Sequence, residues 1–152
     1  MSRYLLDTNI LSNPTKPLPS SSLLAWLGQR DEEDLYIASM TVAEIWRGVE
    51  ERPAGKRRSE LERWFFGPTG PQSAFAGRIL PFDEKSALIW GRLMAEGTNA
   101  GRPRSGLDMI LAATAEANDC IIVTDNEKHF AGLKFINPMR PGGRGSRSGA
   151  PG

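Results

Sequence analysis

The sequence predicts an α/β fold, in which helices pack around a mostly parallel central sheet. Short apolar runs of strand length alternate with amphipathic helical patterns, and this alternation is typical of βαβ units. A length of 152 residues suits one compact domain with one hydrophobic core. Hydrophobic residues make up 39% of the chain and charged residues 24%, as is usual for a globular protein. We therefore expect one α/β sandwich over residues 1–139.

The apolar runs are the expected strands. The first ends at Asp7, and the fourth is the most strongly apolar. The third contains Pro81, which has no amide hydrogen to donate and therefore places this strand at an edge of the sheet. In chain order, the expected strands are residues 4–6, 35–38, 78–82, 120–124 and 135–136.

Helical patterns fill most of the segments between these strands. Pro53 and Gly55 separate the second helix from the third, and Asp83 is the expected N-cap of the fourth. Segment 67–77 holds two prolines and three glycines, so we expect it to be a loop. The expected helices are residues 20–29, 41–50, 56–66, 83–97 and 107–118.

The C-terminal segment 140–152 differs in composition from the rest of the chain. It is rich in Gly, Ser, Arg and Pro, and we expect it to be a disordered tail. The formal net charge is +1, and the tail carries three arginines and no acids, so residues 1–139 are slightly acidic. Global charge therefore neither supports nor excludes a nucleic-acid substrate, which local basic patches or metal ions would have to hold.

The cysteine content and the N-terminal segment help to predict where in the cell the protein is located. Cys120 is the only cysteine, which excludes an intrachain disulfide and a thiolate zinc cluster. It opens an apolar run, so we expect it to act as a small buried hydrophobe. Asp7 comes too early for a signal peptide, and no window reaches the roughly 18 apolar residues of a membrane span. We expect a cytoplasmic protein with no membrane association.

Four acids follow or flank the expected strands. Asp7 and Asp125 come at strand ends, while Glu44 and Asp108 fall in the first turns of the helices that follow. Ligands of open parallel sheets bind at the carboxyl ends of the strands. Clustered carboxylates repel unless a cation neutralises them, and Mg²⁺ and Mn²⁺ prefer oxygen ligands. The pattern indicates metal-dependent phosphodiester hydrolysis.

Three of these acids also have a structural explanation. Thr41 and Glu44 have the spacing of a capping box, and Asp108 could complement the dipole of its helix. Asp125 could be the N-cap of a short helix. Asp7 has no comparable explanation, because Thr8 or Asn9 would serve better as a helix start. These alternatives stay open at this point.

Other catalytic classes lack their residues. The sole histidine, His129, excludes a two-histidine ribonuclease, and neither a phosphate-binding Gly-rich loop nor a Gly-x-Ser-x-Gly elbow is present. Two basic groups could contact RNA. The first group is residues 56–58 with Arg63, next to the aromatic run 64–66. We favour the interpretation that these basic residues form a solvent-exposed helix face, with the aromatic side chains turned toward the core. Arg102 and Arg104 precede Asp108, so substrate positioning there is an open alternative.

Several segments resemble the motifs of one family. Leu5–Ser12 looks like the opening signature of PIN-domain proteins of the VapC type, and within them the FitB-like branch is the best resemblance. The other similar segments, in the family's order, are 39–45 with Gly48, 102–103 with 105–113, 123–126 with Phe130, and 136–138. Together they span nearly the whole chain except the tail.

The resemblance implies a PIN-like α/β/α fold and cleavage of RNA that depends on Mg²⁺ or Mn²⁺. It also implies an antitoxin partner that covers the site, and a homodimer. By match to the motifs, Asp7 and Asp108 would be metal ligands, and Glu44 a ligand or an organiser of metal-bound water. The implied supporting groups are Thr8, Asn9 and Thr124.

The fourth motif departs from the family pattern. The family's acid often lies two residues after the threonine, where this chain has Asn126, and Asp125 is the residue between them. Either side chain could complete the site, so we include both.

Three functions remain after these considerations. The first is a toxin endoribonuclease of a type II toxin–antitoxin pair. The second is a PIN nuclease for RNA processing or for DNA, without an antitoxin. The third is a non-catalytic module that binds a cation. A neighbouring antitoxin gene would separate the first two, and metal-dependent cleavage would separate both from the third.

Overall fold

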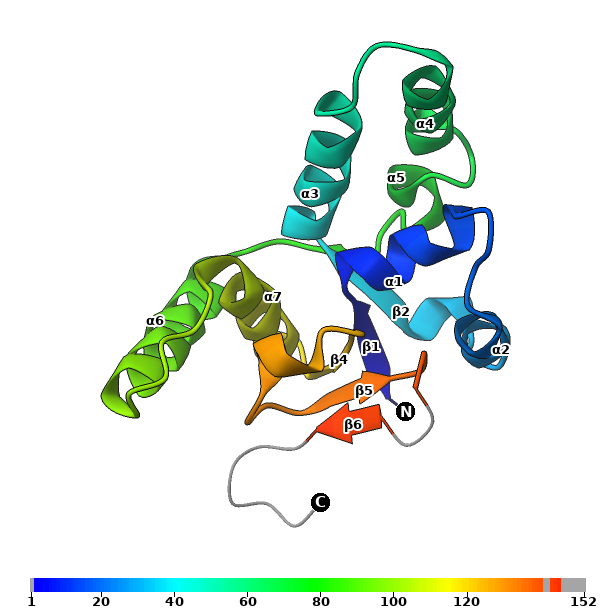
Figure 1. Ribbon diagram of the computed structural model, residues 1–152. Coiled ribbons are helices and arrows are strands. Elements are labelled where there is room, and N and C mark those ends of the chain that lie inside the picture. Colours follow the sequence, from blue (N-terminus) through cyan, green and yellow to red (C-terminus); the bar gives the residue numbers. More distant parts are fainter. Residues whose placement is uncertain (1, 141–142, 146–152) are drawn as a thin grey trace.

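The computed structural model describes residues 2–140 and 143–145 (Figure 1). Its single sheet has the strand order β3-β2-β1-β4-β5-β6. The first five strands are mutually parallel, and β6 runs antiparallel to β5. The expected mostly parallel sheet is therefore confirmed. The strands are β1 Arg3–Leu6, β2 Leu35–Ala38, β3 Ile79–Leu80, β4 Cys120–Val123, β5 Phe135–Asn137 and β6 Gly143–Gly145.

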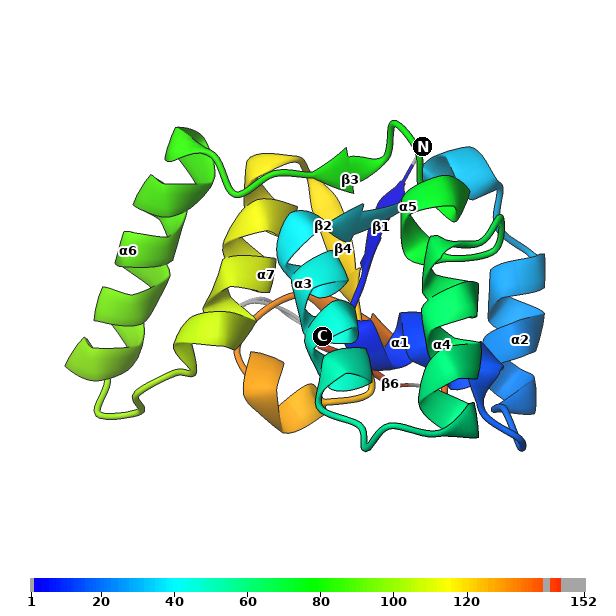
Figure 2. The same ribbon diagram turned by 90° about the horizontal axis from the view of Figure 1, so that it is seen from above.

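Helices cover both faces of this sheet. Seen from above, α6 and α7 lie on one side of the strands, and α1, α2, α4 and α5 lie on the other (Figure 2). This arrangement is the α/β/α sandwich implied by the motifs. The helices are α1 Thr8–Ser12, α2 Ser21–Gly28, α3 Ser39–Glu50, α4 Lys56–Phe66, α5 Pro71–Ala74, α6 Glu84–Asn99 and α7 Gly106–Ala117, with short 3-10 helices at Asn13–Thr15, Glu32–Asp34 and Glu127–Phe130.

Successive side chains of the central strands point to opposite faces of the sheet, and helices cover both faces, so the side chains on each face are buried. Leu5 and Ile122 belong to the core beneath α7, whereas Leu6 and Val123 belong to the core beneath α1 and α2. A shift of either strand by one residue would move its side chains from one core to the other. The register is fixed accordingly, with Leu6 of β1 beside Val123 of β4.

The order of the strands reverses at β1. The chain passes from β1 to β2 on one side, and β4 then pairs with the opposite edge of β1. In open α/β sheets, such a switch point leaves a crevice beyond the carboxyl ends of the two strands. Residues that directly follow β1 and β4 are therefore brought to one place.

Three helices start where the sequence did not predict a start. α3 begins at Ser39 rather than at Thr41, so Thr41 lies inside the helix and is buried. α1 was not expected, and Asp7 is its N-cap. Segment 67–77 was expected to be a loop throughout, but it contains the single-turn helix α5. Both unexpected helices are short, so they carry little apolar periodicity that a sequence pattern could reveal.

The predicted tail begins earlier than the structure supports. Arg140 pairs with Glu127, with Nε donating to Oε2 over 2.6 Å, and residues 143–145 form β6. Strand pairing by backbone atoms needs no apolar side chains, which explains why composition missed this strand. The rest of the expected tail, residues 141–142 and 146–152, lies outside the described residues.

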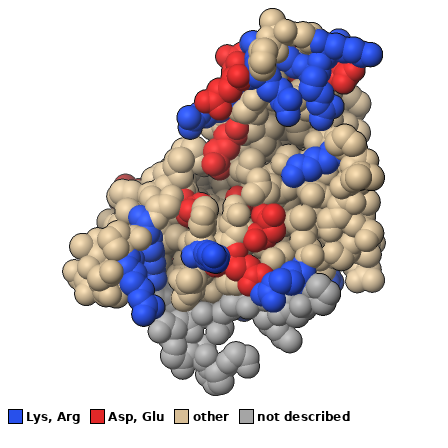
Figure 3. Space-filling model, viewed as in Figure 1, with Lys and Arg blue, Asp and Glu red and all other residues tan. Residues whose placement is uncertain are grey.

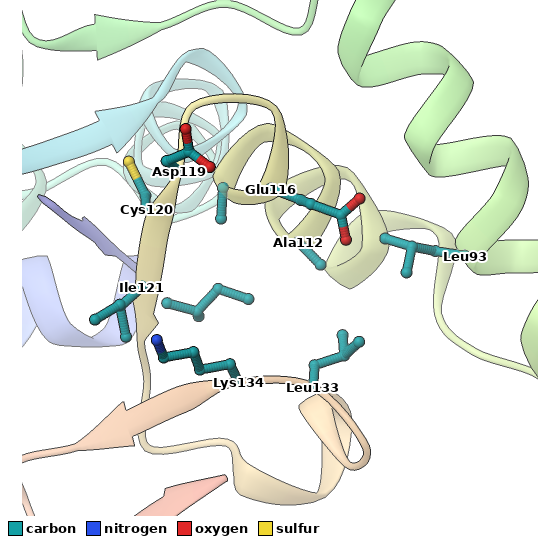
Figure 4. A pocket seen from close by; sticks show the side chains of 10 residues that line it. Leu93, Ala112, Glu116, Asp119, Cys120, Ile121, Leu133 and Lys134 are labelled. Carbon is teal, nitrogen blue, oxygen red and sulfur yellow. The ribbon is translucent and has the colours of Figure 1, made fainter. Parts of the chain in front are cut away.

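The amino end of β4 borders an apolar pocket of about 260 Å³ (Figure 4). Its lining comes from α6, α7, β4 and the segment before β5, and it includes Leu93, Ala112 and Leu133. Cys120 is half-buried there and packs against the core, and burial raises the pKa of its thiol to about 11. Cys120 thus behaves as the small hydrophobe expected. No helix within the described ranges combines the length and the apolarity needed to cross a bilayer.

Candidate active site

Asp7 lies where β1 ends and α1 begins. Its Oδ1 accepts a hydrogen bond from the Thr8 amide over 2.7 Å, and its Oδ2 accepts one from the Thr124 hydroxyl over 2.8 Å. The expectation that Asp7 has no helix-capping role is therefore wrong. Burial raises its pKa, and the nearby carboxylates of Asp108 and Asp125 raise it further, while the two hydrogen bonds oppose this rise.

Thr124 joins the ends of the two central strands. Its fully buried hydroxyl donates to Asp7 and accepts from the Asn126 amide over 3.0 Å. The backbone adds a further link, because the Asp7 amide donates to the Val123 carbonyl over 2.9 Å. The carboxylate of Asp7 is therefore held in one orientation by the fold itself.

Glu44 lies on α3, on the opposite side of Asp7 from β4. Its Oε1 accepts a hydrogen bond from the Thr8 hydroxyl over 3.1 Å. Burial raises the pKa of Glu44, and so do Asp7 and Asp108, while the Thr8 bond and Arg47 lower it. Thr8 thus contacts both carboxylates, through its amide to Asp7 and its hydroxyl to Glu44.

The capping-box explanation of Glu44 is wrong. The N-cap of α3 is Ala38, and the buried Thr41 hydroxyl has no hydrogen-bond partner within the described chain. Glu44 therefore lies in the second turn of the helix, beyond the position that a capping residue occupies.

Asp108 lies in the first turn of α7. The N-cap is Ser105, whose hydroxyl accepts from the Asp108 amide over 3.3 Å, so the Asp108 side chain is not needed as a cap. Its Oδ2 lies 3.1 Å from Nδ1 of His129. Sequence reasoning used His129 only to exclude a mechanism and did not place it in the site. Complementing the helix dipole remains compatible with the position of Asp108.

The fourth motif contributes two different side chains. Asp125 accepts a hydrogen bond from the Asn9 amide group over 3.4 Å and does not cap a helix. Asn126 is the N-cap residue of the 3-10 helix Glu127–Phe130, yet its side chain makes no capping bond. Asn126 lines the pocket described next, whereas Asp125 does not.

These groups surround one open pocket of about 430 Å³. On this face of the molecule, acidic side chains gather around a hollow, and a basic side chain lies beside them (Figure 3). The pocket is lined by Asp7, Thr8, Asn9, Glu44, Arg47, Gly48, Glu51, Ser105, Leu107, Asp108, Asn126 and His129. Of the predicted catalytic and supporting residues, only Thr124 and Asp125 do not line this pocket, and each bonds a residue that does, Thr124 to Asp7 and Asp125 to Asn9. The predicted RNA-contacting residues Arg102 and Arg104 lie outside the lining.

The donor set of the pocket suits a hard divalent cation. Asp7, Glu44 and Asp108 offer only carboxylate oxygens. Burial raises the pKa of Asp7 and of Glu44, and nearby carboxylates, Asp108 among them, raise both further. No three His, Cys, Asp or Glu side chains in the described part of the chain lie close enough to form a ready-made metal site. The residues fit such an ion in chemistry and position, and binding one requires the side chains to converge.

The two arginines before Asp108 differ in environment. Arg104 points toward α6, where its Nη1 donates to the Leu93 carbonyl over 2.8 Å and lies 3.6 Å from Glu96. Arg102 is exposed and has no such partner among the described residues. Of the two, Arg102 alone offers an uncommitted positive charge.

Comparison with known proteins places the chain in a family. The family model described as PIN domain matches residues 4–136. VapC ribonuclease Y4jK of Sinorhizobium fredii is 38% identical over 139 residues, which cover 90% of this chain and 98% of that protein. Toxin FitB of Neisseria gonorrhoeae is 35% identical over 136 residues, with coverage of 88% and 96%.

A solved structure supports the same assignment. The structure described as FitAB bound to an IR36 DNA fragment has a TM-score of 0.82 and 34% identity, and covers 90% of this chain and 96% of that one. The chain therefore belongs to the PIN-domain family, on the branch of the VapC and FitB proteins that its motifs indicated.

Proposed function

We propose that the protein is a divalent-metal-dependent endoribonuclease and the toxin of a type II toxin–antitoxin system. The observation that carries this proposal is the meeting of Asp7, Glu44 and Asp108 in one pocket at the switch point of the sheet. The names of the relatives, a VapC ribonuclease and a toxin, support the reaction class and the biological role.

In this proposal Asp7 and Asp108 hold Mg²⁺ or Mn²⁺, and Glu44 is a third ligand or orients the attacking water. When bound, such an ion supplies a Lewis acid that polarises the phosphate and lowers the pKa of coordinated water. Burial and the repulsion of nearby carboxylates raise the pKa of Asp7 and Glu44, so a cation bound beside them would favour their charged forms.

The remaining residues of the pocket position these carboxylates. Thr124 and the Thr8 amide fix both oxygens of Asp7, and the Thr8 hydroxyl holds Glu44. His129 contacts Oδ2 of Asp108, and both residues line the pocket. Asn126 offers an amide oxygen or an amide hydrogen at the same edge, as a weak ligand or as a donor to a phosphate oxygen.

The proposed partners are an antitoxin, a second copy of the chain and an RNA substrate. The antitoxin is supported by the FitAB complex, a solved two-protein assembly whose similar chain covers 90% of this one. A cytoplasmic location suits a protein that acts on RNA and is neutralised by a second protein. The homodimer rests on the family resemblance alone.

Two other functions make different forecasts. A PIN nuclease without an antitoxin would cleave RNA or DNA but would not be inhibited by the product of an adjacent gene. A non-catalytic module would bind the cation without cleaving either nucleic acid. The relatives' names favour the toxin over both.

The decisive experiment combines growth and cleavage. We expect expression of the chain alone to arrest growth, expression with the adjacent small gene to restore it, and mapped RNA ends to appear only in the first case. Purified protein should cleave RNA with Mg²⁺ and not in excess EDTA. Cleavage that persists in EDTA would contradict the proposal, as would growth arrest without any new RNA ends.

A further inference from the structure

A second hollow adjoins the acidic pocket on its α7 side. It measures about 570 Å³, and its walls come from the end of α6, the loop before α7 and the segment 128–132. Ser105, Asp108 and His129 line both hollows, so the two share a wall. We call this second hollow the basic trough, because four of its lining residues are basic: Arg102, Arg104, Lys128 and His129.

Two of these four residues have no hydrogen-bond or ion-pair partner for their side chains in the described chain. Arg104 bonds the Leu93 carbonyl and lies near Glu96, and His129 contacts Asp108. Arg102 and Lys128 are exposed, and neither has an ion pair or a side-chain hydrogen bond within residues 2–140 and 143–145. Apart from Asp108, no acidic residue lines the trough. Its rim therefore presents positive charge that the protein itself does not neutralise.

The loop that carries Arg102 is fixed against α6. The Arg102 amide donates to the Gly97 carbonyl over 2.8 Å. A Cβ at position 97 would lie 2.9 Å from the Arg102 carbonyl oxygen and 3.0 Å from Cγ of Arg104, so only glycine allows this close approach. Arg104 then anchors the far end of the loop to the Leu93 carbonyl. The backbone that presents Arg102 is thus held in place before any ligand arrives.

We propose that the basic trough binds the backbone phosphates of single-stranded RNA next to the bond that is cleaved. This inference rests on the proposed function and assigns the direction in which the RNA leaves the acidic pocket. Arg102 and Lys128 contact the phosphates, while Arg104 and Gly97 shape the trough. Residues 1–139 are slightly acidic overall, so binding of RNA needs a local basic patch such as this one. Phosphate contacts supply most of the non-specific affinity for nucleic acid.

The other basic surface of the protein is less suited to this role. Lys and Arg side chains gather at the top of the molecule in Figure 3, over the region of α4. Arg57 and Arg58 are paired there with Glu60 and Glu62 of the same helix. Lys and Arg side chains whose charge is already balanced release fewer counterions on binding a polyanion.

A matched pair of double variants tests the proposal. Arg102→Ala/Lys128→Ala removes two unpaired charges from the trough, and Lys56→Ala/Arg63→Ala removes two exposed charges, unpaired in the described chain, from α4. The probe is a fluorescein-labelled oligouridylate of about twelve nucleotides, titrated in excess EDTA over a range of salt concentrations. Because EDTA removes divalent ions, the binding readout does not depend on cleavage or on a bound metal.

We expect the trough variant to bind more weakly and with less dependence on salt. Loss of two phosphate contacts on a single strand makes the slope of log K against log salt less negative by about 1.4. The fall in affinity between 50 and 200 mM salt would then be about sevenfold smaller than for the wild type. The α4 variant should keep the wild-type slope. With Mg²⁺ present, the trough variant should show a raised KM and a kcat within a few-fold of the wild type.

Three results would overturn the proposal. Wild-type affinity and slope for the trough variant would show that RNA does not lie there. A larger loss in the α4 variant would move the RNA to that surface. Wild-type RNA binding together with lost inhibition by the antitoxin would make the trough a protein-docking site. Each of these outcomes leaves the metal-dependent cleavage of the wild type unaffected, so it can be told apart from a failure of the proposed function.

Discussion

The two ends of β4 lie only four residues apart but present opposite chemistry. At the amino end, Cys120 faces an apolar pocket, and burial raises its thiol pKa to about 11, so the thiol stays protonated and unreactive near neutral pH. At the carboxyl end, Thr124 and Asn126 meet Asp7, another half-buried titratable group with a raised pKa. Burial acts on both ends in the same direction.

The difference lies in the hydrogen-bond donors at each end. The Cys120 thiol has a single weak contact, to the Asn118 carbonyl at 3.7 Å. Asp7 receives a donor at each oxygen, from the start of α1 and from Thr124. Donors of this kind favour the charged carboxylate and hold it in place. In this parallel sheet, the carboxyl edge can thus hold a ligand-binding acid, whereas the amino edge is a structural pocket.

The largest expected effect is on cleavage when a carboxylate of the carboxyl edge is neutralised. We expect Asp108→Asn to lower kcat by about a thousandfold or more, because several kcal/mol of charge stabilisation would be lost. The fold should persist, since the Ser105 cap and the α7 packing do not need the charge. Single-turnover cleavage of labelled RNA measures the effect, with Lys134→Ala at the amino-edge pocket as the control. Cleavage by Asp108→Asn at the wild-type rate would contradict the proposed site.

A comparable loss of cleavage is expected for Glu44→Gln. The amide keeps the shape and can still bond the Thr8 hydroxyl, so the melting temperature should not fall. The loss of charge should weaken divalent-ion binding, which calorimetry detects separately from activity. An active Glu44→Gln protein with wild-type metal affinity would reduce the site to Asp7, Asp108 and the Asp125/Asn126 pair.

Thr124 and Cys120 offer a direct comparison of stability at the two ends of β4. Thr124→Val keeps the side-chain shape but leaves Asp7 and the Asn126 amide without their shared partner, so unfolding free energy should fall by about 1–3 kcal/mol. Cys120→Ala removes one half-buried sulfur and should cost about 1 kcal/mol or less, with no change in cleavage. Urea unfolding measures both. A larger cost for Cys120→Ala would reverse the comparison.

A smaller effect is expected in the pH dependence of stability without metal. The pKa of Asp7 is higher in the folded chain than its ordinary value of 3.8, so the folded state holds this proton more tightly. The contribution of Asp7 to stability is therefore greatest below pH 3.8 and falls as the pH rises through the raised pKa.

The variant Asp7→Asn isolates this contribution. In excess EDTA, it should gain stability relative to the wild type as the pH rises from about 3.8 to neutrality. Thermal melts of both proteins across this range give the difference directly. Because Asp83 and Glu127 have lowered pKa values and act in the opposite sense in both proteins, only the difference is informative. Parallel curves for the two proteins would show that Asp7 is not destabilised by burial.

Elements with strong local signals could be predicted from sequence. Helix α4 has the expected bounds of residues 56–66, and Asp83 caps α6 as expected. The short elements α1, α5 and β6 carry no comparable pattern. They form because neighbouring strands and helices position their backbones, which no local window records.

The candidate site likewise contains residues that could be predicted from the sequence and residues that could not. Acids that directly follow β1 and β4 could be placed at one edge, because parallel strands end together. The roles of His129 and Lys128 could not, since both follow from the path of the loop after β4 in space. Thr41 misled the sequence interpretation because a capping-box spacing also occurs inside helices, and only the observed start of α3 separates the two.

The most direct test of the central claim is a calorimetric titration of Mn²⁺ into the wild-type protein and into Asp7→Asn. We expect saturable binding to the wild type and its loss, or a weakening of at least tenfold, in the variant, with both proteins folded by circular dichroism. Equal binding of Mn²⁺ by the two proteins would contradict the claim that the acids at the carboxyl edge of the sheet hold the divalent ion.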